Sequence, residues 1–435
     1  MVLAALIWTG VLLGDDRAEA GMVVSCDQPA VFPGAALNVV VLSYKADRAV
    51  GRPLGGPAQD LGLLLQLNSL LTLGRYGSLG AVYLRSRGYR DDCPEALVED
   101  QLLEKKAGAS TVVRPGKALI LLWGRIYQEG PNIYLQSYLR FLQRERVDGI
   151  ESRIRKGGIF WARTPVQQVA FPPRRLSEKD LLQIQKGFKK AARMYSRPDE
   201  RAPSEPLPVE SYIPVAFSVD RVQDGWLKVS GERIGTGKWL KARIDPREWP
   251  LRQRMPELDF LDAVAGYLQY RVAAAGPGRP TEAIPRWVEE SLGRYGEAAG
   301  PAAPTPEALG KVLLGNLRML TGDPEAAEPL YHRAAGLLPY SADARNLEIV
   351  ANAARHQADI PEKLLEDTWL DALALEPANL DVVNNLEALY SLQLQRQSFQ
   401  TSPGKLREKL YAVERVRAGI LKKRPPEFGT PAGPP

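Results

Sequence analysis

The chain is 435 residues long, which at roughly 100–200 residues per domain predicts two to four domains. Hydrophobic residues make up 45% and charged residues 25%, so a largely disordered chain is excluded. The formal net charge of +6 comes without a long run of Lys or Arg. This argues against nucleic acid as a partner and leaves a weak attraction to an anionic membrane or cell-wall polymer.

The N-terminal segment has the pattern of a secretory signal. Residues 2–13 are mostly apolar, and the Ala-Glu-Ala step at residues 18–20 is typical of a cleavage site. We therefore predict that residues 1–20 are a signal peptide and that the protein is periplasmic or otherwise exported. No Lys or Arg precedes the apolar run, so a buried helix in an intracellular adaptor is the alternative.

The two cysteines bear on export as well. Residues 23–26 resemble a lipoprotein box, which would make Cys26 a lipidation site, although charged residues separate the box from the apolar run. If Cys26 carries no lipid, an oxidising compartment would allow a disulfide between Cys26 and Cys93. Two unrelated buried thiols are the alternative.

Residues 22–195 are predicted to form an α/β domain of sandwich-like architecture. Its strand-like runs alternate with helical patterns, and a turn cluster at 129–132 joins two runs into a hairpin. Ser177 has the position of an N-cap for a helix that would run to about Met194. Residues 196–208, rich in Pro and charge, are predicted to be a linker. The strand-like runs are 37–42, 118–126, 133–141, 159–162 and 166–171.

The order of parts in this domain resembles a family. An opening strand, two helices, and a strand that ends in the Trp-Gly-Arg-Ile step at 123–126 before a hairpin return look like periplasmic domains of the curli-secretion-channel type. Flagellar outer-membrane accessory proteins and penicillin-binding-protein activator lipoproteins share that architecture. The resemblance covers roughly 120 residues and is a likeness of fold. It implies that the protein is located in the cell envelope and has protein partners there. Association with the outer membrane is a further option, and the resemblance brings no catalytic residue with it.

Residues 209–246 are predicted to be a small β domain. Strand-like runs with the turn signal Asp224-Gly225 between them resemble a bacterial SH3-like barrel, with Trp226 and Trp239 at its paired aromatic positions. The resemblance implies a module that binds peptide or cell-wall glycan, or that spaces other domains. Both tryptophans are candidate partner-binding residues, and the alternative is that they fill the core of a small barrel. The nearby glycines fit turns better than a nucleotide loop.

From residue 250 to 424 the hydrophobic period becomes helical. Six residues between 306 and 339 fall at the spacing of the tetratricopeptide repeat, which pairs two antiparallel helices. Small residues in this pattern let the helices approach closely, and an aromatic ring fills the gap between them. The six residues are Leu314, Gly315, Ala327, Tyr331, Ala334 and Pro339.

A degenerate second repeat and a third helix pair are predicted after it. Trp369, Ala372 and Pro377 match the end of a repeat, and a further pair begins near Leu380. Residues 405–422 would be its second helix or a polar capping helix. The overall prediction is a multidomain α+β protein with an α-helical tetratricopeptide-type solenoid at its C-terminus, followed by a disordered tail over 425–435.

The sequence carries no catalytic or metal-binding motif, and we predict a non-enzymatic envelope scaffold or adaptor that needs no cofactor or metal. Its partners would be envelope proteins, or peptidoglycan. A cell-wall-modifying hydrolase with an unrecognised carboxylate pair, and an intracellular repeat adaptor, are the alternatives. Asparagine amides on the first helix of each pair could bind a peptide backbone, or could simply be solvated. The candidate partner-binding residues on these helices are Asn316, Arg345, Asn346, Asn384 and Asn385.

Overall fold

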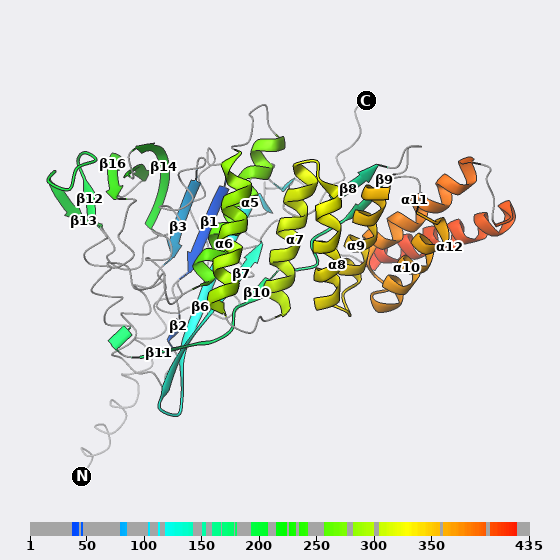
Figure 1. Ribbon diagram of the computed structural model, residues 1–435, viewed down its shortest axis with the longest axis horizontal. Helices are drawn as coiled ribbons and strands as arrows, with labels where there is room; N and C mark the ends of the chain where they lie inside the picture. The colour runs from blue at the N-terminus through cyan, green and yellow to red at the C-terminus, as the bar shows by residue number, and fades with distance from the viewer. Residues whose placement is uncertain are drawn as a thin grey trace, which may run out of the picture.

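The computed structural model combines a strand-rich N-terminal part with a helical C-terminal part, in agreement with the predicted mixed architecture (Figure 1). The signal segment, both cysteines, most of the helices expected between the strands, and the C-terminal tail lie outside the described residues. The structure describes residues 37–42, 45–46, 79–84, 103–104, 112–113, 118–141, 150–153, 159–166, 168–177, 179–180, 193–207, 215–223, 226–231, 235–241, 256–275, 282–299, 304–356, 360–396 and 401–423.

A 12-stranded sheet forms the N-terminal part. Its order is β10-β7-β6-β1-β3-β14-β15-β16-β12-β13, with β11 also paired to β7 and β2 to β6. Strands β1, β3 and β6 are parallel, and the others on this path pair antiparallel. The bounds are β1 Leu37–Leu42, β2 Lys45–Ala46, β3 Leu79–Leu84, β6 Ala118–Glu129, β7 Asn132–Phe141, β10 Gln168–Ala170, β11 Arg174–Leu176, β12 Arg193–Tyr195, β13 Ser204–Pro206, β14 Val215–Gln223, β15 Trp226–Gly231 and β16 Gly235–Lys241.

The hairpin predicted for residues 118–141 is confirmed. Strands β6 and β7 pair from Ile120 with Phe141 to Glu129 with Asn132, around a turn in which Gly130 has a φ of 57°. Two smaller two-stranded sheets lie apart from the large one. They are β4 (Leu103–Glu104) with β5 (Val112–Val113), and β8 (Ile150–Arg153) with β9 (Ile159–Ala162).

The structure differs from the expected linker over residues 196–208. Strands β12 and β13 form a hairpin there, and the side chains of Ala202 and Leu207 are buried. Met194, expected near the end of a helix, lies instead inside β12. Composition does not distinguish the two structures, because Pro and charged residues are compatible with a short edge hairpin as well as with a free linker.

The expected separate SH3-like barrel is instead a continuation of the large sheet. Strand β14 pairs with β15, and its N-terminal half pairs with β3, while β16 pairs with β12. The sequence pattern placed strands at β14, β15 and β16, but it took Gly235 and Gly237 as turns before the last of them. Both glycines instead lie inside β16, with a φ of 73° each, and the turn signal at 224–225 lies outside the described residues. The sequence pattern could not show that the first of these strands has a partner more than 130 residues earlier in the chain.

The helical part is a series of antiparallel neighbours that extends away from the sheet (Figure 1). Helices α5 and α6 lie against the sheet, and α7 to α12 continue beyond it. The predicted repeat over 306–339 coincides with α7 and α8, and the degenerate repeat with α9 and α10. The bounds are α5 Glu257–Ala275, α6 Ala283–Ala299, α7 Pro304–Leu320, α8 Pro324–Leu337, α9 Ala342–His356, α10 Glu362–Leu375, α11 Leu380–Arg396 and α12 Pro403–Lys423.

Gly315 lets α7 and α8 approach closely. A Cβ atom at this position would lie 2.6 Å from Cε1 of Tyr331, whose ring is fully buried and whose hydroxyl is hydrogen bonded to Asn316.

We expect Gly315→Ala to lower the free energy of unfolding by about 1–3 kcal/mol, because the buried ring would have to shift against its packed neighbours. Gly310→Ala is the matched control on the same helix. Its Cβ would meet Leu292 at an ordinary 3.4 Å, so urea denaturation should show no loss and a gain of up to about 1 kcal/mol. Equal losses in both variants would contradict the packing argument.

The contact between the sheet and α5 contains a buried carboxyl group. Ser137 of β7 donates a hydrogen bond of 2.8 Å to Glu257 at the start of α5, and the rings of Phe171, Phe260 and Tyr295 pack edge to face around this region. Burial raises the pKa of Glu257 more than the hydrogen bond from Ser137 and the charge of Arg174 lower it.

This raised pKa gives stability a pH dependence of defined sign. Above the ordinary pKa of glutamate the unfolded chain loses its proton while the folded protein still holds it, so the contribution of Glu257 falls as the pH rises towards its folded pKa. We expect Glu257→Gln to be more stable than the wild type at neutral pH and to flatten this part of the profile. Melting temperatures between about pH 4 and about pH 8 would test it. Glu297→Gln, at an exposed position of α6, should keep the wild-type profile.

Candidate peptide-binding face

The first helices of the three C-terminal pairs, α7, α9 and α11, contact a segment from the N-terminal part of the same chain. Helix α9 contacts both β8 and β9, α11 contacts β9, and α7 contacts β10. In Figure 1 the teal β8–β9 hairpin lies beside α9 and α11, and the chain runs from it back to β10 at the large sheet. We call the side of α7, α9 and α11 that makes these contacts the first-helix face.

Strand β9 presents alternate side chains to this face. Phe160 and Ala162 are fully buried, whereas Ile159 is 52% exposed and Trp161 is half-buried, as the two-residue period of a strand requires. The ring of Phe160 meets the ring of Trp369 edge to face, with centroids 4.8 Å apart. Phe160 and Ala162, with Ile150 from β8, therefore belong to the same apolar core as the helices.

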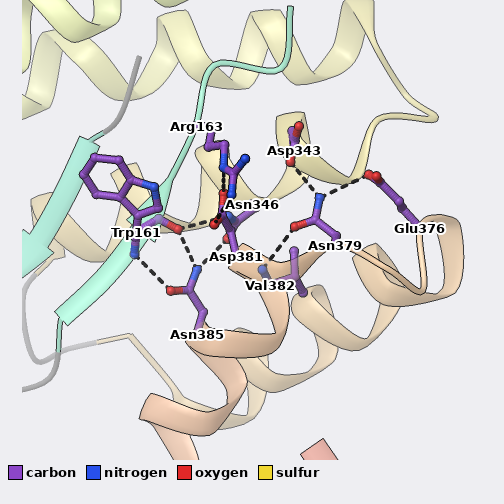
Figure 2. A network of polar contacts seen from close by, with 9 residues as sticks. All are labelled: Trp161, Arg163, Asp343, Asn346, Glu376, Asn379, Asp381, Val382 and Asn385. Carbon is purple, nitrogen blue, oxygen red and sulfur yellow. Dashed lines mark hydrogen bonds and ion pairs between the residues drawn. The ribbon is translucent and has the colours of Figure 1, made fainter. Parts of the chain in front are cut away.

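Asn385 of α11 binds the main chain of β9 at two atoms (Figure 2). The backbone N–H of Trp161 donates to Oδ1 of Asn385 at 2.9 Å, and Nδ2 of Asn385 donates to the carbonyl oxygen of Trp161 at 2.8 Å. In an antiparallel pair a residue directs both groups to the same side, so this edge of β9 faces α11 while β8 lies along the other. The asparagine amide takes the place of a neighbouring strand.

Asn346 of α9 reinforces this contact. Its Nδ2 donates to the same carbonyl oxygen of Trp161 at 3.0 Å, and its Oδ1 accepts from Nδ2 of Asn385 at 2.8 Å and from Nε1 of Trp369 at 2.9 Å. An indole N–H can only donate, so Trp369 fixes which end of the Asn346 amide faces the strand. The two asparagines and Trp369 form one fully connected network around a single residue of the hairpin.

An ion pair holds the next part of the segment. Both Nε and an Nη atom of Arg163 bond to the carboxylate of Asp381, the second at 2.9 Å. The Asp381 side chain is only 7% exposed and that of Arg163 20%. Asp381 lies in the first turn of α11, where the helix N-terminus also favours a negative charge. Two parallel bonds of this kind need the planar guanidinium of arginine.

The turn before α11 is fixed by a second asparagine contact, also drawn in Figure 2. Oδ1 of Asn379 accepts from the backbone N–H of Val382 at 3.2 Å, and Nδ2 donates to Asp343 at 2.6 Å and to Glu376 at 3.1 Å. This cap joins the end of α10 to α9 and positions the first turn of α11. It places Asp343, Glu376 and Asp381 around one end of the face, which is therefore acidic.

The predicted partner-binding residues separate into different roles. Asn346 and Asn385 come together and bind a main chain, although it is the protein's own. Asn316 of α7 is buried, where it accepts from Tyr331 and donates to Tyr267 of α5, so it holds helices together. Arg345 donates to the carbonyl oxygen of Pro339 at 3.4 Å. Asn384 is exposed.

The two tryptophans proposed for partner binding are side chains of the sheet core. Trp226 of β15 and Trp239 of β16 are 9% and 8% exposed, and Trp226 meets Tyr195 edge to face. Neither indole presents a free face for stacking on a sugar ring.

The sequence did not predict the roles of Trp161, Arg163 and Asp381. The alternation of β9 was a local signal for that strand. The contact between Arg163 and Asp381 had no local signal, because the two residues are 218 positions apart.

Comparison with protein-family models, with curated proteins and with solved structures found no match for this chain. Within the described ranges no helix combines the length and apolar character needed to cross a bilayer. The same ranges hold no group of three or more His, Cys, Asp or Glu side chains suited to a metal ion.

Proposed function

We propose that this protein is a scaffold or adaptor of the bacterial cell envelope whose helical array binds extended segments of protein chain. The observation that carries the proposal is the contact of Asn346 and Asn385 with both main-chain polar groups of Trp161. Main-chain atoms are common to every peptide, so an amide pair of this kind binds extended chains as a class. Side-chain contacts on either side then select among them.

The chemistry of the face favours holding a chain. Its polar groups include amides that donate and accept at once, and the carboxylate that contacts the bound segment, Asp381, is paired with arginine. These groups match the backbone and the side chains of a peptide in kind. The resemblance of the helix pairs to tetratricopeptide repeats supports the same use, since such arrays present their first helices to peptide ligands.

The envelope location rests on the sequence. The apolar segment with its Ala-Glu-Ala step and the likeness of the N-terminal domain to periplasmic domains both favour export. Cell fractionation with intact-mass measurement would test it. Removal of residues 1–20, or a lipid on Cys26, would support export, and an intact N-terminus in the cytoplasm would refute it.

Photocrosslinking in the source organism tests the binding function. A photoreactive phenylalanine analogue in place of Asn384 lies on α11 beside Asn385 and points into solvent. We expect it to crosslink to a segment of another protein, identified by peptide mapping. The same analogue at Arg415, exposed on α12, is the matched control and should not give that product. Crosslinks that reach only this chain would mean that the first-helix face serves as an internal fastening, and the proposal would fail.

A further inference from the structure

We propose that the segment from Phe160 to Arg163 is a built-in competitor for the first-helix face. The external ligand would then be an extended peptide with the pattern aromatic, any residue, small residue, arginine. This inference rests on the proposed function and specifies the ligand of the same site. The protein's own segment already makes every contact that a bound peptide of that pattern would make.

The first and third positions of the pattern are set by burial. Phe160 is fully buried against Trp369, so an aromatic ring fits there and a polar or charged side chain would lose its hydration without compensation. Ala162 is also fully buried within the helix core, so a larger side chain would have to displace packed neighbours. The position between them is permissive, because Trp161 is bound through its main chain and its side chain is half-buried.

The fourth position is set by charge and geometry. Asp381 accepts two parallel bonds from Arg163, and Asp343 and Glu376 lie near the same end of the face. Lysine carries the charge but is a point donor and cannot reproduce the paired contact. An acidic residue here would face the carboxylate of Asp381, so charge complementarity identifies a basic, arginine-bearing ligand.

The β8–β9 hairpin is held in a way that permits exchange. It is a two-stranded sheet separate from the large one, so it can leave the helices without breaking any pairing of the 12-stranded sheet. An isolated two-stranded hairpin is marginal in water, so its order depends on the helices. Departure alone would leave the amides of Asn346 and Asn385 and the carboxylate of Asp381 without these partners. A ligand of the same pattern restores all of these contacts at once.

A tethered segment competes at an effective concentration on the order of millimolar, so an external peptide binds the wild type weakly. Weakening the hairpin should therefore reveal the external affinity. The probe is a fluorescent, end-blocked peptide of residues 159–166, Ile-Phe-Trp-Ala-Arg-Thr-Pro-Val, followed by anisotropy. We expect it to bind Phe160→Ala/Arg163→Ala at least about tenfold more tightly than the wild type. Ile159→Ala, an exposed position of the same strand, is the matched control and should behave as wild type.

Changes in the peptide test the pattern without altering the protein. A peptide with Glu in place of its arginine, and one with Ser in place of its phenylalanine, should each bind the weakened variant at least about tenfold less tightly. Equal binding of all three peptides, or no binding of the original to a weakened variant that melts cooperatively, would overturn the proposal. If the weakened variant does not fold, amide exchange of Trp161 in the wild type replaces it as the readout. Faster exchange at millimolar peptide supports displacement, and unchanged exchange refutes it.

A random decapeptide library selected on the weakened variant separates this inference from the proposed function. Enrichment of the aromatic–any–small–arginine pattern supports both. Enrichment of a different pattern, abolished by Asn385→Ala, would leave the peptide-binding function standing and overturn the pattern. No enrichment at all would count against both.

Discussion

Replacing Asn346 with alanine is expected to lower the free energy of unfolding by about 2–4 kcal/mol, because several buried partners lose their hydrogen bonds at once. Trp369 would keep a buried indole N–H with no acceptor at Asn346, and Asn385 would lose the oxygen that accepts from its Nδ2. The carbonyl oxygen of Trp161 would keep one of its two donors. Each buried group left unsatisfied costs about 1–3 kcal/mol, and some relaxation is expected to recover part of the sum.

Urea denaturation followed by the circular dichroism of the helices would measure this effect. Asn384→Ala is the matched control, because it removes the same type of side chain from an exposed position of α11, one residue before Asn385. A surface change of this type alters stability by less than about 0.5 kcal/mol. A loss in Asn346→Ala no larger than that of the control would show that the network is replaced by water at little cost.

Arg163→Ala is expected to lower stability by about 3 kcal/mol, because it leaves the Asp381 carboxylate, 7% exposed, without its guanidinium. The hairpin should lose stability before the helices do, because Arg163 anchors the hairpin and is not itself part of a helix. Amide exchange should accordingly become faster at Trp161 than in α9 and α10. The comparison of these two regions is the informative measurement.

Two further variants distinguish the causes of that loss. Arg163→Lys keeps the positive charge and loses the paired geometry, so it should recover about half of the lost stability. Arg163→Met with Asp381→Leu removes both charges, and it should be more stable than Arg163→Ala, because no charge remains buried and unpaired. If the double variant were as unstable as Arg163→Ala, the loss would have to come from packing of the arginine stem.

The sequence predicted those parts of the fold whose signal is local. The hairpin of β6 and β7 has a turn cluster between two alternating runs, and the pair α7–α8 has Gly315 and Tyr331 fewer than 20 residues apart. Such patterns are complete within one segment, so they can be read without knowing the rest of the chain. The same holds for Asn346 and Asn385, whose place on first helices follows from the helical period.

The remainder depends on pairings between distant segments. Strand β14 has the composition of an edge or a barrel strand, and only its partner β3 decides which it is. Likewise, nothing near Trp161 indicates that Asn385 will bind it from 224 residues away. Of the four asparagines proposed from the sequence, only Asn346 and Asn385 contact a main chain, and it is the protein's own. The expectation that these positions are not needed for packing is wrong, because both side chains are buried.

The long separation in sequence between the β8–β9 hairpin and the helices that it contacts also affects folding during synthesis. Strand β9 leaves the ribosome about 200 residues before α10 and about 220 before α11, so Phe160 stays without Trp369, and Trp161 without Asn385, until those helices are made. Contacts of such high sequence separation form late and slowly. During that interval the nascent chain carries an exposed, aromatic-containing β-segment of the kind that associates with other unfolded chains. A chain that stopped after α10 would keep the contacts of the segment with α9 and Trp369 but would lack both Asp381 and Asn385.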